Sequence, residues 1–361
     1  MKIITIVGAR PQFIKAAMVS RAIQRYNQSA PQKKVKEIIV HTGQHFDRAM
    51  SEVFFEQLEI PYPDINLDIN SCSHGEMTGR MLMELEKIYV EHQPDRVLVY
   101  GDTNSTLAGA LAAAKLHISV AHVEAGLRSF NNKMPEEINR VLTDHMSDML
   151  FCPTELAVKN LENEGLAQKV YLVGDVMYDS ILYYREMAEK QSHILSQLKL
   201  EPKNYFLVTL HRAENTDNIS NLKSICDALN HLTEEGHTII VPLHPRTQKK
   251  LKDSGIKISG VRFIEPVAYL DMLMLEKSAS AILTDSGGMQ KEAYWLGVPC
   301  ITLREETEWT ETCDLGWNIL VGANTEKILH AVKNIQTGKK GGAVYGDGFA
   351  AGKIVDLLTG L

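Results

Sequence analysis

The feature that most constrains this chain is a repeated alternation of short apolar runs with longer stretches of helical period. The runs are rich in Val, Ile and Leu and are bounded by Gly, Asp or His. A strand of this kind must be buried on both faces, and the helices between successive strands provide the cover. The pattern therefore predicts an α/β fold with parallel sheets.

Two such series follow one another. The strands expected in the first are 3–7, 37–41, 96–100, 118–122, 149–152 and 170–173, and those in the second are 205–210, 238–243, 261–264, 281–284, 300–303 and 318–321. The helices expected between them include 13–26, 74–92, 137–147, 218–235, 269–277 and 288–296. Single cores stop growing at roughly 250 to 300 residues. A chain of 361 residues is therefore predicted to form two Rossmann-like domains, 1–175 and 176–345, whose sheets face a cleft and whose connection lies within 178–200.

Composition argues against several classes of partner and site. The net charge of −7 disfavours nucleic acid, and the longest apolar stretch, 107–123, is interrupted by Lys115 and His117 and reads as a buried helix rather than a membrane span. The five cysteines are odd in number and form no C-x-x-C pair, which fits a reducing cytoplasm without disulfides or zinc. His41 and His45 have metal-like spacing but no third ligand in sequence, so we expect neither a metal nor another cofactor.

One candidate anion site follows the expected strand 281–284, where the chain reads Asp285-Ser286-Gly287-Gly288. The free N–H groups and the positive dipole end of a helix that starts here favour a phosphate. Ser286, Gly287 and Gly288 are therefore a predicted diphosphate cradle, and Glu292 could reach a ribose diol. The competing interpretation is a plain strand-to-helix turn capped by Ser286.

A second candidate follows the first strand, where Arg10 is expected in the loop and Lys15 on the first turn of the next helix. A guanidinium and an ammonium that point at one anion suit a pyrophosphate. The segment is neither a G-x-G-x-x-G loop nor a Walker loop, so it does not favour NAD or ATP. The alternative is that both cations are simply solvated.

Acidic residues gather at the expected strand ends. Asp102 and Glu124 follow neighbouring central strands, and Glu136 lies near a helix start. Carboxylates that converge on one cleft are costly unless they share protons or meet cations, which favours a functional role. Asp102 and Glu136 could instead cap helices. His211 ends the first strand of the second domain, and its ordinary pKa suits proton transfer.

Six motifs together resemble the non-hydrolysing UDP-N-acetylglucosamine 2-epimerases over nearly the whole chain. They are Gly8-Ala9-Arg10-Pro11, Gly101-Asp102-Thr103, the run from His122 to Arg128, the run from Pro135 to Arg140, His211-Arg212 and Asp285-Ser286-Gly287-Gly288. The resemblance implies two GT-B-like halves, a C-terminal helix within 346–361 that returns to the first domain, and a homodimer.

The same resemblance implies the roles of individual residues. Asp102, Glu124, Glu136 and His211 correspond to the catalytic set, and Arg10, Lys15, Ser286, Gly287, Gly288, Glu292 and Arg304 correspond to the UDP contacts. The implied reaction inverts C2 of the sugar by anti elimination of UDP and syn re-addition of UDP to the glycal.

Three departures bear on the substrate. Trp309-Thr310 stands where the UDP-N-acetylglucosamine pattern has Arg-Pro, Gln12 replaces a Glu, and Gly174-Asp175-Val176-Met177 replaces a Gly-Asn-Thr run. These variants resemble the branch that acts on UDP-2,3-diacetamido-2,3-dideoxy-D-glucuronate, a precursor of O-antigen sugars in lipopolysaccharide. A uronate needs an additional cation, which Arg128, Lys133 or Arg212 could supply.

Four alternatives stay open at this level. They are a UDP-N-acetylglucosamine 2-epimerase, a GT-B glycosyltransferase, a hydrolysing epimerase and a non-enzymatic nucleotide-sugar sensor. A glycosyltransferase would need an acceptor groove where the three acids and the histidine are expected, and a sensor would bind the nucleotide sugar without turning it over.

Overall fold

The computed structural model describes residues 1–44, 55–243, 247, 250–251, 254–339 and 343–360. The chain divides into two compact units. Unit 1 comprises Met1–Leu182 and Ala343–Leu361, and unit 2 comprises Tyr183–Gly342.

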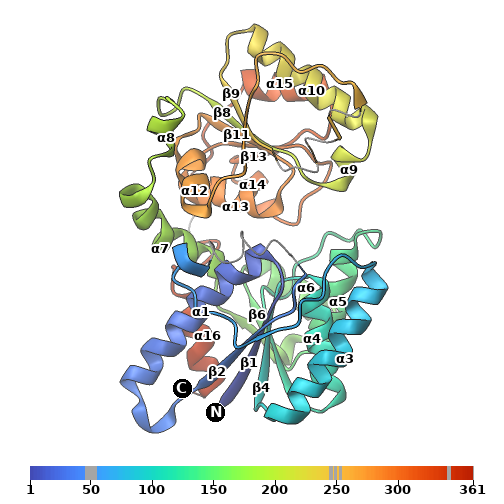
Figure 1. The fold of residues 1–361 in the computed structure, drawn as a ribbon, viewed down its shortest axis with the longest axis vertical. Helices are drawn as coiled ribbons and strands as arrows, with labels where there is room; N and C mark the ends of the chain where they lie inside the picture. Colours follow the sequence, from blue (N-terminus) through green and yellow to red (C-terminus); the bar gives the residue numbers. More distant parts are fainter. Residues whose placement is uncertain (45–54, 244–246, 248–249, 252–253, 340–342, 361) are drawn as a thin grey trace. The chain divides into compact units, whose positions relative to one another are not determined.

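Unit 1 is built on a seven-stranded sheet in the order β3-β2-β1-β4-β5-β6-β7, and all of its strand pairs are parallel (Figure 1). The strands are β1 Lys2–Val7, β2 Lys36–His41, β3 Ile65–Asn66, β4 Arg96–Tyr100, β5 Ser119–Val123, β6 Met149–Cys152 and β7 Val170–Leu172. From β1 the chain winds outward through β2 and β3, and from β4 it winds the other way. The β1/β4 boundary is therefore a topological switch point, the place where such sheets bind ligands.

Apolar strand residues hold the helices of unit 1 against the sheet. Ile4 and Ile6 of β1 belong to the core that includes Met81 and Leu85 of one covering helix and Ala110 of the next. The helices of unit 1 are α1 Arg10–Ser29, α3 His74–His92, α4 Asn104–Lys115, α5 Pro135–Met146, α6 Glu155–Asn163 and α16 Ala350–Thr359, and the first part of α7 Val176–Gln191 also belongs to this unit.

The last helix, α16, lies beside α1 although the two are far apart in sequence (Figure 1). Its start is fixed by Asp179 of α7, whose carboxylate accepts the backbone N–H groups of Ala350 at 3.1 Å and Ala351 at 2.8 Å. These are two of the donors that a helix N-terminus leaves without an intrahelical partner. A side chain from another helix therefore caps α16.

Unit 2 contains a six-stranded parallel sheet in the order β10-β9-β8-β11-β12-β13. The strands are β8 Phe206–Thr209, β9 Ile239–Pro242, β10 Arg262–Ile264, β11 Ala281–Thr284, β12 Cys300–Thr302 and β13 Asn318–Leu320. The switch point here lies between β8 and β11. The longer helices are α10 Ile219–Glu234, α12 Tyr269–Ser278, α13 Gly287–Leu296 and α15 Thr325–Lys333, and the short ones are α8 Ile194–Gln197, α9 Ala213–Thr216 and α14 Thr310–Asp314.

Alternate residues of the central strand β8 serve opposite faces of the sheet. Val208 packs in the core with Leu229 of α10, whereas Leu207 packs in the core with Leu275 of α12. This period of two explains why Phe206, Leu207 and Val208 are apolar in succession.

The predicted α/β class with two parallel sheets is confirmed, and every predicted strand is present to within two residues at either end. The two-residue edge strand β3 was not predicted. No helix in the described part of the chain combines the length and apolar character that a membrane span requires.

Candidate active site residues of the two units

Arg10 and Lys15 lie on α1, which follows the first strand of unit 1 at the switch point. Arg10 is the first residue of α1 and not a loop residue as predicted, because Pro11 suits a first helical turn and the helix starts early. Lys15 consequently lies in the second turn. Gly8, between strand and helix, permits this close turn, since a Cβ there would stand 2.1 Å from Ser105 Oγ and 2.2 Å from Thr42 Oγ1.

Gln12 ties this turn to the loop after β4. Its Oε1 accepts the backbone N–H groups of Gly8 at 2.8 Å and Ala9 at 2.9 Å. Its Nε2 donates to the carbonyl oxygen of Tyr100 at 2.7 Å and lies 2.9 Å from Thr103 Oγ1. An amide can accept at one end and donate at the other, so Gln12 joins the two loops of the switch point.

Lys15 forms an ion pair with Glu124, with Nζ 2.6 Å from Oε1. The side chains are only 8% and 10% exposed, so each charge depends on the other for compensation. Glu124 follows β5 with a φ of 70°, a left-handed conformation that is uncommon for a residue with a side chain. Strain of this kind is concentrated at functional sites, which agrees with the predicted role.

Asp102 is paired with Arg140, a residue of α5 that had no predicted role. Arg140 donates to Oδ2 of Asp102 through Nη2 at 2.5 Å and through Nε at 3.2 Å, and its Nη1 lies 2.9 Å from Oε2 of Glu137. In the sequence, the only indication of this arginine is its place at the end of the motif from Pro135 to Arg140. The guanidinium thus compensates the charge of a partly buried carboxylate from two of its nitrogens.

The capping explanation for the acids is wrong. Thr103 is the N-cap of α4, and its side chain accepts from the N–H of Thr106, so Asp102 precedes the cap. Met134 is the N-cap of α5, and Glu136 lies half-buried in the first turn of that helix.

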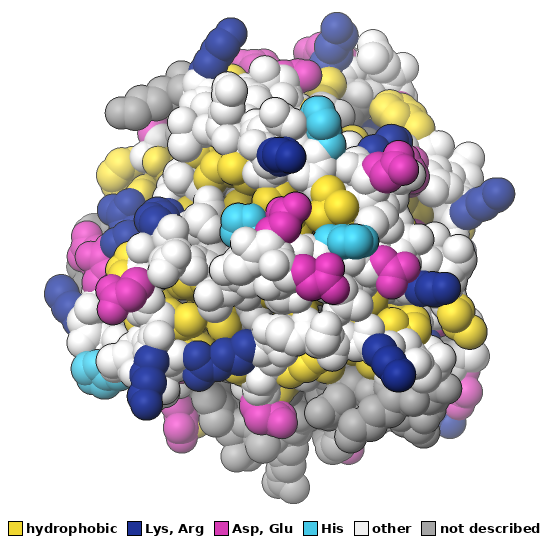
Figure 2. All heavy atoms as spheres, turned by 90° about the horizontal axis from the view of Figure 1, so that it is seen from above, with side chains coloured by type: hydrophobic (Ala, Val, Ile, Leu, Met, Phe, Trp, Pro, Cys, Tyr) yellow, Lys and Arg dark blue, Asp and Glu magenta, His cyan; other side chains and the backbone are white. Residues whose placement is uncertain are grey.

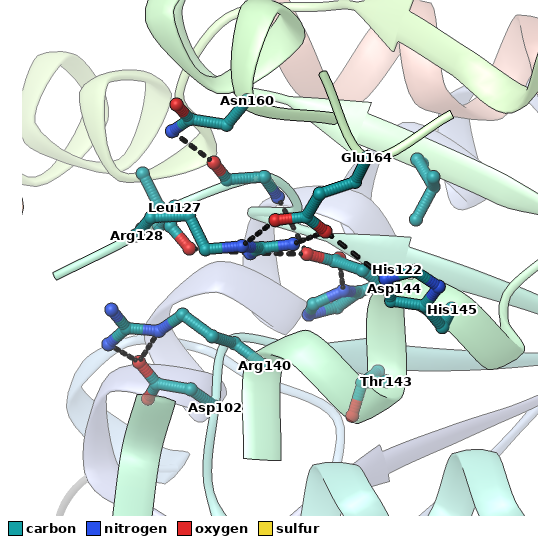
Figure 3. A network of polar contacts seen from close by, with 12 residues as sticks. Asp102, His122, Leu127, Arg128, Arg140, Thr143, Asp144, His145, Asn160 and Glu164 are labelled. Atoms are coloured by element: carbon teal, nitrogen blue, oxygen red, sulfur yellow. Dashed lines mark hydrogen bonds and ion pairs between the residues drawn. The ribbon is translucent and has the colours of Figure 1, made fainter. Parts of the chain in front are cut away.

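A buried polar network lies behind the β5 strand end (Figure 3). Arg128 donates to Oδ2 of Asp144 at 2.7 Å and to both carboxylate oxygens of Glu164 at 2.7 Å. The side chain of Arg128 is 1% exposed. The expectation that Arg128 could bind a substrate uronate is therefore not supported, because its guanidinium is already committed to two carboxylates.

In unit 2, the predicted diphosphate cradle is the N-terminus of α13. Ser286 is its N-cap and its hydroxyl accepts from the N–H of Met289, so the capping interpretation also holds for this serine. A Cβ on Gly287 would lie 2.9 Å from Oε1 of Glu308. Glu308 is in turn neutralised by Arg304, whose Nη1 is 3.1 Å from Oε2, with both side chains buried.

Glu292 belongs to a buried cluster on the inner turns of α13. It accepts a hydrogen bond of 3.1 Å from the hydroxyl of Tyr269, and it also interacts with Glu276, which is fully buried. Burial, and then the charge of Glu292 and a hydrogen bond to it, raise the pKa of Glu276 well above its ordinary value. Burial beside Glu292 thus disfavours the charged form of Glu276.

His211 follows β8 at the second switch point and is held by Asp285. Its backbone N–H donates to Asp285 Oδ1 at 3.1 Å, and its ring Nδ1 lies 3.0 Å from the same oxygen. Burial alone would raise the pKa of Asp285, but the hydrogen bond and charge of His211, with donors from Arg212 and Asn215, outweigh it and lower the pKa. The His211 side chain is 52% exposed, so its Nε2 side is available to a ligand.

Within the described residues, no group of three or more His, Cys, Asp or Glu side chains could hold a metal ion. His41 is buried, and His45 lies outside the described residues. On the face seen in Figure 2, basic side chains are interspersed with acidic ones. The candidate chemistry is therefore that of carboxylates, a histidine and local cations.

Comparison with known proteins decides the family. The family model described as UDP-N-acetylglucosamine 2-epimerase matches residues 27–359. The chain belongs to the UDP-N-acetylglucosamine 2-epimerase family. This membership confirms the resemblance carried by the six motifs and the expected class of enzyme, an isomerase.

Individual 2-epimerases match over their full length. The chain is 52% identical to the UDP-2,3-diacetamido-2,3-dideoxy-D-glucuronate 2-epimerase of Pseudomonas aeruginosa and 53% identical to a UDP-N-acetylglucosamine 2-epimerase homolog of Methanococcus maripaludis, with 100% of each chain covered. The crystal structure of the Methanocaldococcus jannaschii UDP-GlcNAc 2-epimerase, in complex with UDP-GlcNAc and UDP, matches with a TM-score of 0.92 and 47% identity over 100% of both chains.

Proposed function

We propose that this protein is a non-hydrolysing 2-epimerase that inverts C2 of a UDP-2-acetamido sugar. The observation that carries the proposal is the arrangement at the β1/β4 switch point of unit 1. There Glu124, strained and paired with Lys15, lies at the end of the strand next to the one that Asp102 follows, and Asp102 is paired with Arg140. A nucleotide binder without chemistry would have no need to hold two ionised carboxylates in this way.

The reaction explains why both cations and carboxylates are present. The C2 proton is not acidic until the C1–O bond loosens, which leaves positive charge at C1 and negative charge on UDP. We assign the carboxyl groups of Asp102, Glu124 and Glu136 to the first charge. One of them, ionised, removes the C2 proton, and another, protonated from solvent, delivers a proton to the opposite face; the two then exchange with water and return to their starting states.

UDP must be retained while the glycal exists. Within unit 2, we assign this task to Arg304 and to the N–H groups at the start of α13, contributed by Ser286, Gly287 and Gly288. Within unit 1, Arg10 and Lys15 on the first two turns of α1 are the cations that suit a diphosphate. Glu292 suits the ribose diol, and His211, oriented by Asp285, suits proton transfer or stabilisation of the leaving diphosphate.

For the substrate, we propose UDP-2,3-diacetamido-2,3-dideoxy-D-glucuronate, with UDP-N-acetylglucosamine as the second candidate. Overall identity does not choose between them, because the relatives at 52% and 53% carry different names. The Trp309 departure supports the first candidate. Lys291 Nζ lies 3.6 Å from the centre of the Trp309 ring, so the arginine of the other pattern would place two cations together here.

Because Arg128 is paired with Asp144 and Glu164, we propose that the side chain that binds the uronate carboxylate is Lys133 or Arg212. Lys133 is exposed and Arg212 is half-buried.

The test is to incubate the pure protein with each UDP-sugar in D₂O and to follow C2 by NMR. Inversion with deuterium at C2 is expected, faster with the diacetamido uronate. Inversion without deuterium would argue against elimination, equal turnover of both sugars would remove the substrate preference, and release of free sugar would indicate a hydrolysing enzyme.

We further propose that the enzyme is a homodimer of the cytoplasm that supplies a precursor for surface polysaccharide. All five cysteines fall within the described residues and each is unpaired, which suits a reducing compartment. The family resemblance is the basis for the dimer, and sedimentation of the purified protein tests it.

A further inference from the structure

His122 of β5 is fully buried, and both of its ring nitrogens face oxygen atoms, one of them the Asp144 carboxylate oxygen seen in Figure 3. Nδ1 lies 2.7 Å from Oδ1 of Asp144, and Nε2 lies 2.7 Å from the carbonyl oxygen of Gly101. A carbonyl oxygen can only accept a hydrogen bond. A neutral imidazole carries one N–H, so it could satisfy one of these contacts and would set two lone pairs against each other in the second.

The second partner is also an acceptor, because Asp144 is ionised. Its Oδ2 accepts the N–H of Gly126 at 3.1 Å and the guanidinium of Arg128 at 2.7 Å. Burial alone would raise the pKa of Asp144, but the hydrogen bonds and charges of His122 and Arg128 outweigh it and lower the pKa. Neither neighbour of the ring can therefore supply a proton.

We propose that His122 donates a hydrogen bond from each of its two ring nitrogens and that it acts as the positioning residue for the carboxylates at the β4 and β5 strand ends. One N–H binds the Asp144 carboxylate, and the other binds the peptide carbonyl of Gly101, directly before Asp102. His122 does not touch the substrate in this role.

The contact with Gly101 gives His122 its influence on the site. Gly101 has a φ of 61°, and its N–H donates to the carbonyl oxygen of Val123 at 3.0 Å. A Cβ on Gly101 would lie 3.4 Å from Nζ of Lys15 and 3.5 Å from Oε1 of Glu124, so this peptide packs against the ion pair. Fixing the Gly101 carbonyl therefore fixes the start of the Asp102 loop and one wall of the Glu124 site.

The imidazolium also places a buried positive charge behind the acids. The charged or ionisable groups of the network around it are Asp144, Arg128, Glu164 and His145, and Lys15 and Glu124 lie beside the Gly101 peptide that it binds. A positive charge at this position favours the ionised forms of Asp102 and Glu124.

Ring protonation can be measured directly and without any substrate. The protein is labelled with ¹⁵N in its histidine rings, and proton–nitrogen correlation spectra are recorded between pH 6 and 8. The His122 signals are identified in the unmodified protein by nuclear Overhauser effects from its ring protons to Gly101, and their loss in His122→Gln checks the assignment. Both ring nitrogens are expected to carry a proton throughout this range, whereas a spectrum with one bare nitrogen would overturn the proposal even if the variant fails to fold.

The positioning role rests on the proposed function and is tested by kinetics. In His122→Gln we expect kcat to fall roughly 100-fold with KM within a few-fold, because the acids are displaced and not removed. The acidic limb of the kcat profile should move to higher pH, since the neighbouring carboxylates lose a cation.

His145→Gln is the matched control. This histidine belongs to the same network, with Nε2 3.2 Å from Oε2 of Glu164, but its side chain is about half exposed. The kinetics of the variant should therefore stay near those of the unmodified enzyme. A His122→Gln enzyme with unchanged kcat and pH profile would overturn the positioning role. An unmodified protein inactive on both UDP-sugars would instead refute the proposed function, and the ring spectra would still decide the protonation state.

Discussion

Asp285 holds His211 at two points, since the same carboxylate oxygen accepts both the backbone N–H and the ring Nδ1 of the histidine. The pair joins the ends of β8 and β11, which are hydrogen-bonded neighbours in the unit 2 sheet. This arrangement fixes the ring so that Nδ1 carries the proton and Nε2 points away from the protein core.

The first prediction concerns this pair. Asp285→Asn should reduce kcat roughly 10- to 100-fold, because the neutral amide no longer selects the same ring tautomer or stabilises a charged ring. In a His211→Gln background the same change should have little further effect, which a double-mutant cycle measures. Full additivity of the two losses would show that Asp285 acts independently of His211.

Lys15→Met tests the ion pair with Glu124. Removal of the lysine leaves a nearly buried carboxylate without its cation, so the free energy of unfolding of unit 1 should fall by roughly 3 kcal/mol. The double variant Lys15→Met, Glu124→Gln removes both charges and should recover part of this loss. Denaturant unfolding gives both values. Lys87→Met is the control, because Lys87 pairs with Glu84 at 2.7 Å on the surface of α3 and its loss should cost under about 1 kcal/mol.

Asp179 gives a pH dependence of stability. Burial raises its pKa to about 6 although two backbone N–H groups of α16 lower it. The native protein therefore binds this proton more tightly than the unfolded chain, and the contribution to stability is full below about pH 4 and decreases as the pH rises to about 6, by roughly 2 to 3 kcal/mol.

Asp179→Asn should abolish this part of the pH dependence, as measured by denaturant unfolding or by hydrogen exchange of the Ala350 and Ala351 amides at pH 4 and pH 7. Asp356→Asn, which changes an exposed carboxylate on α16, is the control. The prediction fails if the two variants have the same pH dependence.

Gly8→Ala should destabilise unit 1 by roughly 2 kcal/mol or more, because the added Cβ would overlap Ser105 and Thr42 and displace the start of α1. Gly79→Ala, on α3, has open space for its Cβ and should instead stabilise the helix by about 0.5 to 1 kcal/mol. Thermal unfolding of the two variants should therefore shift in opposite directions.

Strands could be predicted well because each fully apolar run has few alternatives inside an α/β fold. The exception, β3, is a two-residue edge strand whose residues are only half-buried or exposed, so it leaves no apolar run. Helix starts were harder to predict than strands. The helix expected from residue 13 begins at Arg10, with Pro11 in its first turn.

Residues of the candidate site were predictable as types, but their pairings were not. Arg140 reaches Asp102 across 38 positions and His122 reaches Asp144 across 22, and no local spacing encodes such contacts. Arg128 shows the reverse error. Its position in a strand-end motif suggested a ligand contact, but the direction of a side chain depends on tertiary packing, which turns Arg128 toward Asp144 and Glu164.

The raised pKa of Glu276 has a consequence for the charge near the start of α13. Two ionised glutamates on and beside this helix would repel a diphosphate and offset much of the attraction of the helix N-terminus. Burial instead favours the neutral form of Glu276, which leaves Glu292 as a single negative charge that accepts a hydrogen bond from the Tyr269 hydroxyl. The contact with a ribose that we propose for Glu292 is therefore compatible with a diphosphate at the start of the same helix.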